Sequence, residues 1–142
     1  MAQYRTTIES SKSVEEAFDY MADFSNAKEW DPGVVAGESL DASVAEGSRF
    51  RLVSRFLGRE LPLEYRIVAF DRPHRVVFEA TESWGRSVDE VRVTSVAGRT
   101  EVSYEADLRL KGAAVVADPL LALAFRRIGD RAAEGLRRAL AT

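Results

Sequence analysis

The chain has no cysteine and a single histidine among its 142 residues. Without cysteine, the protein cannot form disulfides, use a catalytic thiol or bind a metal through thiolates. The histidine, His74, follows Pro73 in a predicted turn, and carboxylates at irregular spacing do not define a metal site. The sequence also contains no GxGxxG, Walker A or nucleophile-elbow motif. We therefore expect no metal and no cofactor.

Long apolar runs and a large excess of one charge are missing as well. No stretch approaches the ~20 apolar residues that span a bilayer, and the N-terminal segment MAQYRTTIES has no signal-peptide pattern. We therefore expect no transmembrane segment and a cytoplasmic protein. The net charge of −3 predicts no phosphate-binding surface and so no nucleic-acid partner. A length of 142 residues with 46% hydrophobic content predicts one domain, residues 1–142, with a substantial core.

What the sequence does contain is a series of runs that alternate apolar and polar residues, a pattern typical of half-buried strands. These runs cover 3–9, 34–41, 48–57, 60–70, 75–83, 86–96 and 99–110. Short turns join the later runs, and connections this short favour antiparallel neighbours. Between the first two strands, Ser13 and Glu16 form a capping box that begins a helix, and a second short helix is predicted at 25–30.

The last predicted element is a long helix over 118–141, with Asp118 as its N-cap and Pro119 at its first position. The resulting order, β-α-α-β-β-β-β-β-β-α, indicates an α+β fold in which this helix covers one face of an antiparallel sheet. Gly129 and Gly135 border the apolar stripe of the helix. Two explanations are open for them: close packing of the helix against the sheet, or a void beneath the helix.

A cavity between this helix and the inner face of the sheet would suit a small apolar molecule. Alternation assigns the residues of that face. The predicted ligand-binding residues are Phe50, Leu52, Ser54, Leu63, Tyr65, Phe78, Ala80, Val91, Tyr104, Ala106, Leu121, Phe125 and Gly129. The hydroxyls of Tyr65, Tyr104 and Ser54 either orient a ligand oxygen or belong to structural residues without a part in binding.

Glu82, Asp89 and Tyr104 are weak candidates for catalysis, and we assign no catalytic residue. Glu82 and Asp89 have inner parity on two strands joined by one turn, so we expect them near each other, with Arg86 close by. A desolvated carboxylate with a raised pKa can act as the acid/base of a cyclase. The alternative is that both carboxylates reach water at the end of the hairpin.

Four segments carry a family resemblance: SVEEAFDYMADFSNAKEWDPGV, GSRFRL, GRTEVSYEADLRLKG and DPLLALAFRRIGDRAAEGLRRAL. With the order of elements, they make the chain resemble the START-like helix-grip superfamily (SRPBCC), and within it the polyketide cyclase/dehydratase and lipid-transport group. The resemblance implies a seven-stranded antiparallel sheet wrapped around the C-terminal helix, with a ligand cavity between them. It implies no catalytic residue, because members range from lipid carriers to cyclases and share no catalytic motif.

Trp30 and Trp84 are candidates for a lid over the cavity mouth. In the resembled family an aromatic residue is common at the position of Trp30, where it packs the helix pair beneath the sheet, and this is its alternative role. Trp84 lies at a predicted hairpin tip, where it can touch a ligand, a membrane or a partner.

Three functions are open. The first is binding of a hydrophobic small molecule, as a carrier or sensor of a polyketide, lipid, quinone or isoprenoid. The second is a polyketide cyclase, aromatase or dehydratase that uses an acid/base in the pocket. The third is a protein-interaction module with a filled core, which a cavity smaller than ~300 Å³ would favour. The sequence is compatible with a monomer and with a homodimer.

Overall fold

The computed structural model describes residues 2–56, 58–111 and 119–141, with the backbone alone for residues 2, 56 and 119–122. The elements in chain order are β1 Ala2–Ser10, α1 Val14–Ala22, the 3₁₀ helix η1 Phe24–Asn26, α2 Ala27–Trp30, β2 Val34–Ser39, β3 Arg49–Phe56, β4 Arg59–Asp71, β5 Arg75–Glu82, β6 Gly85–Val96, β7 Arg99–Leu110 and α4 Pro119–Leu140. The predicted α+β order is confirmed. The predicted N-cap Asp118 lies outside the described residues.

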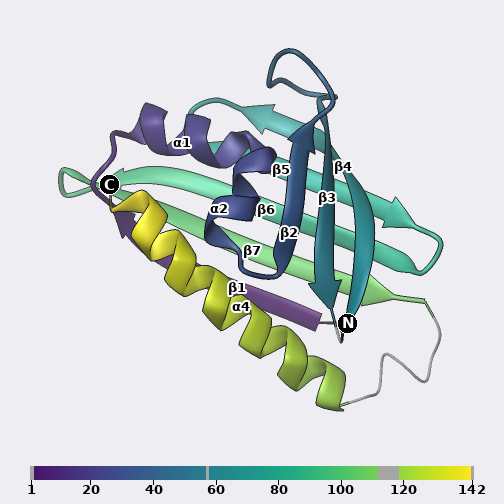
Figure 1. Cartoon of the computed structure of the whole chain (residues 1–142). Helices are drawn as coiled ribbons and strands as arrows, with labels where there is room; N and C mark the ends of the chain where they lie inside the picture. Colours follow the sequence, from purple (N-terminus) through teal and green to yellow (C-terminus); the bar gives the residue numbers. More distant parts are fainter. Residues whose placement is uncertain (1, 57, 112–118, 142) are drawn as a thin grey trace.

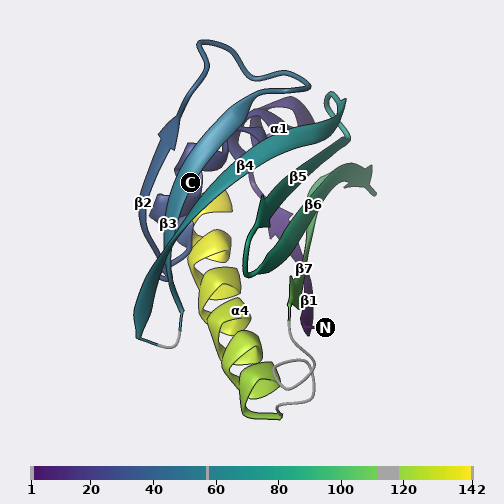
Figure 2. The same cartoon turned by 90° about the vertical axis from the view of Figure 1, so that its right-hand side faces the viewer.

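Seven strands form one antiparallel sheet in the order β1-β7-β6-β5-β4-β3-β2. The strands from β2 to β7 form the predicted meander, and β1 joins the open edge of β7 with an unbroken register from Ala2↔Leu108 to Ser10↔Thr100. The sheet curls, and α4 lies along its concave side (Figures 1 and 2). This is the helix-grip arrangement that the family resemblance implies.

The helices between β1 and β2 close one end of the curled sheet. The predicted capping box begins α1: the Ser13 hydroxyl accepts from the Glu16 N–H at 3.1 Å, and the Glu16 carboxylate accepts from the Ser13 N–H at 3.4 Å. The helix predicted at 25–30 is divided, because the Asp23 carboxylate accepts from the Ser25 N–H and begins η1 before α2. This pair of short helices places Trp30 beneath the sheet.

Strand alternation separates an apolar inner face from a charged outer face, as predicted. The fully buried inner side chains include Phe50, Leu52, Ile67, Val76, Phe78, Val91, Val93 and Val102. The outer face carries cross-strand ion pairs such as Arg5 with Glu105 and Arg86 with Glu79. Exposed pairs of this kind contribute little to stability, so the core supplies most of the folding free energy.

Within the described ranges, no helix is both long and apolar enough to cross a bilayer.

The glycines of α4 are explained by close packing. A Cβ added at Gly135 would lie 1.9 Å from the backbone oxygen of Trp30, and one at Gly129 would lie 2.3 Å from the ring of Tyr4. Neither position leaves room for a side chain. The alternative interpretation, a void beneath these glycines, is therefore wrong, because Tyr4 and the end of α2 occupy that space.

We expect Gly135→Ala to destabilise the protein although alanine is the better helix former by about 1 kcal/mol. The added methyl group meets backbone rather than a movable side chain, and overpacking of this kind costs about 1–3 kcal/mol. Urea unfolding measures the loss. The neighbouring exposed variant Glu134→Ala, the control, should change stability by less than ~0.5 kcal/mol. A stabilised Gly135→Ala protein would contradict the close contact.

The Phe78 side chain is at the centre of the aromatic core. Its ring stacks on Phe24 at a centroid distance of 4.0 Å and an interplanar angle of 9°, and the Phe50 ring meets it edge-on at 6.1 Å. Phe78 is fully buried. These rings link the sheet to η1, so they hold the short helices in place.

Phe78→Ala should lower the free energy of unfolding by about 3–5 kcal/mol, because it leaves a void in close-packed surroundings. Chemical denaturation provides the measurement, with Val68→Ala as a matched truncation of a side chain that is 43% exposed. A loss for Phe78→Ala as small as that of the control would mean that Phe78 lines an existing cavity.

Candidate functional site

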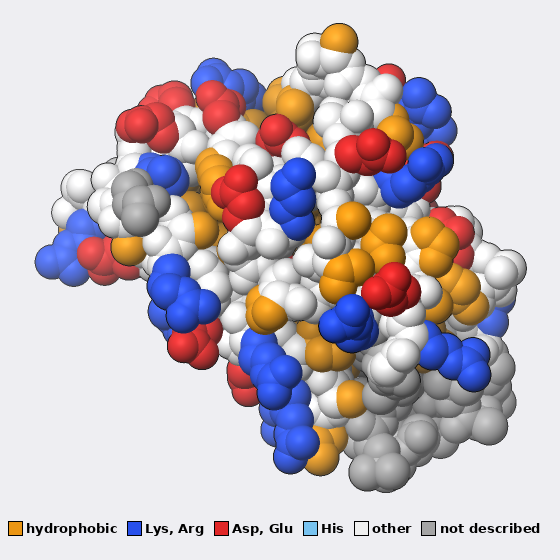
Figure 3. Space-filling model, viewed as in Figure 1, with side chains coloured by type: hydrophobic (Ala, Val, Ile, Leu, Met, Phe, Trp, Pro, Cys, Tyr) orange, Lys and Arg blue, Asp and Glu red, His pale blue; other side chains and the backbone are white. Residues whose placement is uncertain are grey.

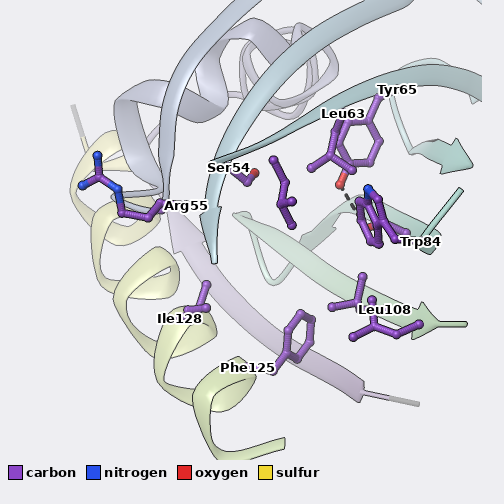
Figure 4. A pocket seen from close by; sticks show the side chains of 12 residues that line it. Ser54, Arg55, Leu63, Tyr65, Trp84, Leu108, Phe125 and Ile128 are labelled. Atoms are coloured by element: carbon purple, nitrogen blue, oxygen red, sulfur yellow. Dashed lines mark hydrogen bonds between the residues drawn. The ribbon is translucent and has the colours of Figure 1, made fainter. Parts of the chain in front are cut away.

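A cavity of about 110 Å³ lies between α4 and the concave face of the sheet. Most of its lining is apolar, and it draws on β3, β4, β6, β7, α4 and the loop before β2 (Figure 4). The lining residues are Gly33, Ser54, Arg55, Leu61, Leu63, Tyr65, Trp84, Ser87, Leu108, Leu110, Phe125 and Ile128. The guanidinium of Arg55 points away from the cavity (Figure 4) and pairs with Glu60 at 3.2 Å. The lining is therefore apolar with a few hydroxyl groups.

The two halves of α4 differ in how they are packed. Its buried side chains in the described part lie in the C-terminal half, at Ala132, Ala133, Leu136 and Leu140. The carbonyl oxygen of Leu140 accepts from the Ser10 hydroxyl at 2.8 Å and from the Ser11 N–H at 3.1 Å, which holds this end. The C-terminal half is thus anchored to β1 and the turn that follows it.

Apolar side chains near the cavity remain partly open to solvent. Phe125, Ile128 and Trp84 are half-buried, and Leu123 on the same helix is 45% exposed. Figure 3 shows hydrophobic side chains gathered in the region between the end of β3 and the hairpin that links β5 to β6. An apolar molecule in the cavity would cover part of this surface.

One wall of the cavity carries a chain of hydrogen-bonded side chains. The Tyr65 hydroxyl donates to the Ser87 hydroxyl at 3.0 Å, and the Ser87 hydroxyl donates to Asp89 Oδ1 at 3.3 Å. The Tyr104 hydroxyl donates to Asp89 Oδ2. Tyr65 and Ser87 line the cavity, and their mutual hydrogen bond is drawn in Figure 4. Asp89 lies behind them and connects to the cavity through Ser87.

Asp89 is a buried acid with neutral partners. Its side chain is 4% exposed. Burial raises the pKa of Asp89 to about 7, the hydrogen bonds from Tyr104 and Ser87 act in the opposite direction, and the charge of Asp31 raises it further. Both hydrogen-bond donors are hydroxyls, which stabilise a carboxylate less than a cation would. The acid therefore exchanges its proton near neutral pH.

Asp31 is a second acid close enough to influence the first. It follows α2, where its carboxylate accepts from the Gly33 N–H at 2.8 Å, and burial raises the pKa of Asp31 to about 6. Sequence reasoning missed both Asp31 and Ser87. Ser87 shares the inner parity of Asp89 on β6 and could have been found from it, whereas Asp31 reads as an ordinary turn residue.

The expected pair of Glu82 and Asp89 does not form. In the β5–β6 register Glu82 lies opposite Gly85, while Asp89 lies opposite Phe78, far along the hairpin. The Glu82 carboxylate instead accepts from the Glu64 N–H at 3.5 Å. Arg86 is on the outer face and bonds to Glu79. Because the hairpin turn is tight, Glu82 lies next to the turn, whereas Asp89 lies several residues further along β6.

The other predicted site residues divide into three groups. Those that line the cavity are Ser54, Leu63, Tyr65, Trp84 and Phe125. Those that belong to the buried core around it are Phe50, Leu52, Phe78, Ala80, Val91 and Tyr104. Ala106 is partly buried and lies opposite Asp89 in the sheet, Gly129 packs on Tyr4, and the side chain of Leu121 lies outside the described residues.

Of the two candidate lids, Trp30 is a core residue. It is 3% exposed, and its ring meets that of Tyr104 edge-on at 5.4 Å. It cannot serve as a lid because it is packed between α4 and the sheet. Trp84 is half-buried at the cavity wall, where a ligand would touch it.

No metal centre is evident in the part of the chain that the structure describes, since no three His, Cys, Asp or Glu side chains come together to hold an ion.

Comparison with known proteins identifies the family. The model of the family described as polyketide cyclase / dehydrase and lipid transport matches residues 1–141. The chain belongs to this family. No curated protein matches the sequence significantly. The family and the fold are those of START-like domains that bind hydrophobic ligands, and they leave the class of ligand undetermined.

Solved structures show how closely this chain keeps the START-like fold. A START superfamily protein from Mycobacterium smegmatis has a TM-score of 0.79 at 13% identity, covering 99% of this chain and 97% of that one. A protein from Thermus thermophilus has a TM-score of 0.77 at 15% identity, with 98% and 95% covered. Ginseng major latex-like protein 151 from Panax ginseng has a TM-score of 0.72 at 13% identity, and the match covers 99% of this chain and 98% of that one.

The cavity is small for a site that binds a hydrophobic ligand. Its volume of about 110 Å³ is below the ~300 Å³ at the lower end for ligand pockets. A cavity of this size has room for a small ring system or for one end of a larger ligand. The small volume also favours the filled-core alternative, so binding has to be tested directly.

The buried acid predicts a pH-dependent stability that Asp89→Asn removes. The folded pKa of about 7 lies above the ordinary value of 3.8, so between these values the native state binds a proton that the unfolded state has released. The free energy of unfolding therefore falls as the pH rises from about 4 to about 7. The total loss from this group is up to about 4 kcal/mol. Asparagine does not titrate, so the variant should gain stability relative to the wild type over this range.

Urea unfolding of both proteins across this pH range measures the difference. Val68→Ala, which changes an exposed side chain that does not titrate, is the control and should give a difference from wild type that does not change with pH. A pH-independent difference for Asp89→Asn as well would mean that Asp89 ionises in the native state at its ordinary pKa.

Proposed function

We propose that the chain binds a mostly apolar small molecule in the cavity under α4, as a carrier or sensor of a polyketide, lipid, quinone or isoprenoid. The observation that carries the proposal is the combination of a partly solvated apolar lining with one polar wall, where the hydroxyls of Tyr65 and Ser87 face the cavity. Ligand sites typically have this composition, with few polar groups that fix orientation.

The apolar lining provides the driving force. Each 100 Å² of apolar surface removed from water contributes about 2.5 kcal/mol, and Phe125, Ile128 and Trp84 still have surface to bury. A ligand larger than the cavity must extend past these residues or displace the N-terminal half of α4. In the described part of this half, Leu123 is exposed and Phe125 and Ile128 are half-buried, whereas the buried side chains described on α4 are in its C-terminal half.

A polyketide cyclase or dehydratase is the second candidate, and the burial of Asp89 is the observation that favours it. A general acid/base works best with a pKa near the working pH, and burial raises the pKa of Asp89 to about 7. Asp89 is separated from the cavity by Ser87 and Tyr65, so it would exchange protons with a substrate through their hydroxyls. A protein-interaction module remains the third candidate because the cavity is small.

Filling the cavity should weaken binding of a small apolar probe. We expect Ser54→Leu to weaken binding of 1-naphthol, followed by its fluorescence, by at least about tenfold, because the larger side chain occupies the cavity that Ser54 lines. Stability should be unchanged or higher, since filling a void adds contacts without displacing packed atoms. Val68→Leu, at an exposed position, is the control and should bind the probe like the wild type.

Equal affinity in wild type and Ser54→Leu would mean that the probe binds elsewhere. Destabilisation of Ser54→Leu with no detectable probe binding by the wild type would favour the filled-core module. Native mass spectrometry of protein purified from its own host would then identify any retained ligand.

A further inference from the structure

We infer that the Tyr65 hydroxyl is a ligand contact whose hydrogen-bonding sense, donor or acceptor, is set by the protonation of Asp89 and transmitted by Ser87. The inference rests on the proposed binding function and names the ligand chemistry at that site: an apolar molecule with one carbonyl or hydroxyl oxygen. It starts from the geometry of the four linked side chains, in which Tyr65 and Ser87 line the cavity and Asp89 and Tyr104 lie behind them.

With Asp89 ionised, the hydrogens of the chain all point toward the carboxylate. Tyr104 donates to Oδ2, Ser87 donates to Oδ1, and Tyr65 donates to Ser87. The Tyr65 hydroxyl has one hydrogen, which Ser87 already receives, so its oxygen offers the cavity lone pairs alone. In this state the wall accepts a hydrogen bond from a ligand hydroxyl and repels a ligand carbonyl.

With Asp89 protonated, the order along the Ser87 arm reverses. The carboxyl Oδ1–H donates to the Ser87 oxygen, the Ser87 hydroxyl donates to the Tyr65 oxygen, and the Tyr65 hydrogen turns into the cavity. One proton has been added at Asp89, and the remaining changes are rotations of hydroxyl groups, so no other group gains or loses a proton. The wall then donates a hydrogen bond to a ligand carbonyl.

The Ser87 arm is the one that reverses because it ends at the cavity. Among the described residues, the hydrogen-bond partner of the Tyr104 hydroxyl is Asp89, and Tyr104 is packed edge-on against Trp30. Reversal at Tyr104 would leave its hydrogen facing an apolar surface, and an unpaired buried donor is costly. Reversal at Ser87 instead delivers the hydrogen to a ligand.

Burial of Asp89, together with its titratable neighbours, places the proton exchange near neutral pH. Asp31 faces it from the segment after α2, Tyr104 from β7 and Tyr65 from β4. Glu82, at the end of β5, acts on Tyr65. Burial and the negative charge of Asp31 both favour the protonated acid, and the pKa of about 7 lets either form of the wall be populated under ordinary conditions.

Two probes of nearly equal shape separate the two states: 1-indanone, which can accept a hydrogen bond but not donate one, and 1-indanol, which can do both. Titrations of each probe followed by protein NMR at about pH 5.5 and about pH 8.5 span the titration of Asp89. We expect 1-indanone to bind about tenfold more weakly at the higher pH, and 1-indanol to bind equally at both. Calorimetry in two buffers of different ionisation enthalpy should show proton uptake with the ketone and not with the alcohol.

Asp89→Asn provides the sharpest variant, because its amide nitrogen can donate to Ser87 while its carbonyl oxygen accepts from Tyr104. It imitates the protonated acid at every pH, so its affinity for 1-indanone should be high and independent of pH. Ser87→Ala interrupts the row of hydrogen bonds between Asp89 and Tyr65, so it should also remove the pH dependence. This second variant tests the inference if Asp89→Asn does not fold. Asp31→Asn should keep the dependence and move its midpoint to lower pH.

The outcomes are distinct for the two proposals. Binding of both probes without any pH dependence, or a ketone dependence that persists in Asp89→Asn or Ser87→Ala, overturns the switch and leaves the binding function standing. Absence of binding for both probes at every pH overturns the binding function, and the switch with it. A ketone-specific dependence that both variants abolish supports the inference.

Discussion

The close contact of α4 with β1 and α2 is the constraint on which the rest of this structure depends. At Gly129 the helix meets the Tyr4 ring, and at Gly135 it meets the backbone of Trp30 at distances that exclude a Cβ. The Tyr4 hydroxyl also donates to Asp130 at 2.9 Å. This contact fixes the C-terminal half of the helix on one end of the sheet. The cavity lies under the other half, where the described apolar side chains Leu123, Phe125 and Ile128 are exposed or half-buried.

The same contact keeps the acid dry. Trp30 touches α4 through its backbone and the Tyr104 ring through its indole, and Tyr104 bonds to Asp89. Packing of the helix therefore shields the carboxylate from water. Burying a carboxylate with neutral partners costs free energy, which a purely structural core would avoid by using an apolar residue. The free-energy cost of this buried carboxylate is consistent with the role that we propose for Asp89 in the hydrogen-bonded wall of the cavity.

Much of the fold was readable from the sequence, because it depends on local patterns. Alternation assigned the inner faces of β3 to β7, the Ser13–Glu16 capping box began α1, and the short turns indicated the meander. The site was less readable, because it depends on registers and distances between segments. Glu82 and Asp89 share parity, yet the tight hairpin separates them. Gly135 looks the same in sequence whether it faces a void or the backbone of Trp30.

The position of the anchor also determines how the cavity can change in size. Local opening of a protein follows the elements with the fewest buried contacts. In the described part of α4 the buried side chains lie between Ala132 and Leu140, whereas Leu123 is exposed and Phe125 and Ile128 are half-buried. Outward movement of the preceding turns would enlarge the cavity while the glycine contacts remain in place. The hydrogen-bonded wall is on the sheet and not on the helix, so its geometry would be preserved as the helix moves. For the proposed binding function, this arrangement would combine a fixed polar wall with an adjustable apolar one, which suits recognition of one oxygen on ligands of differing bulk.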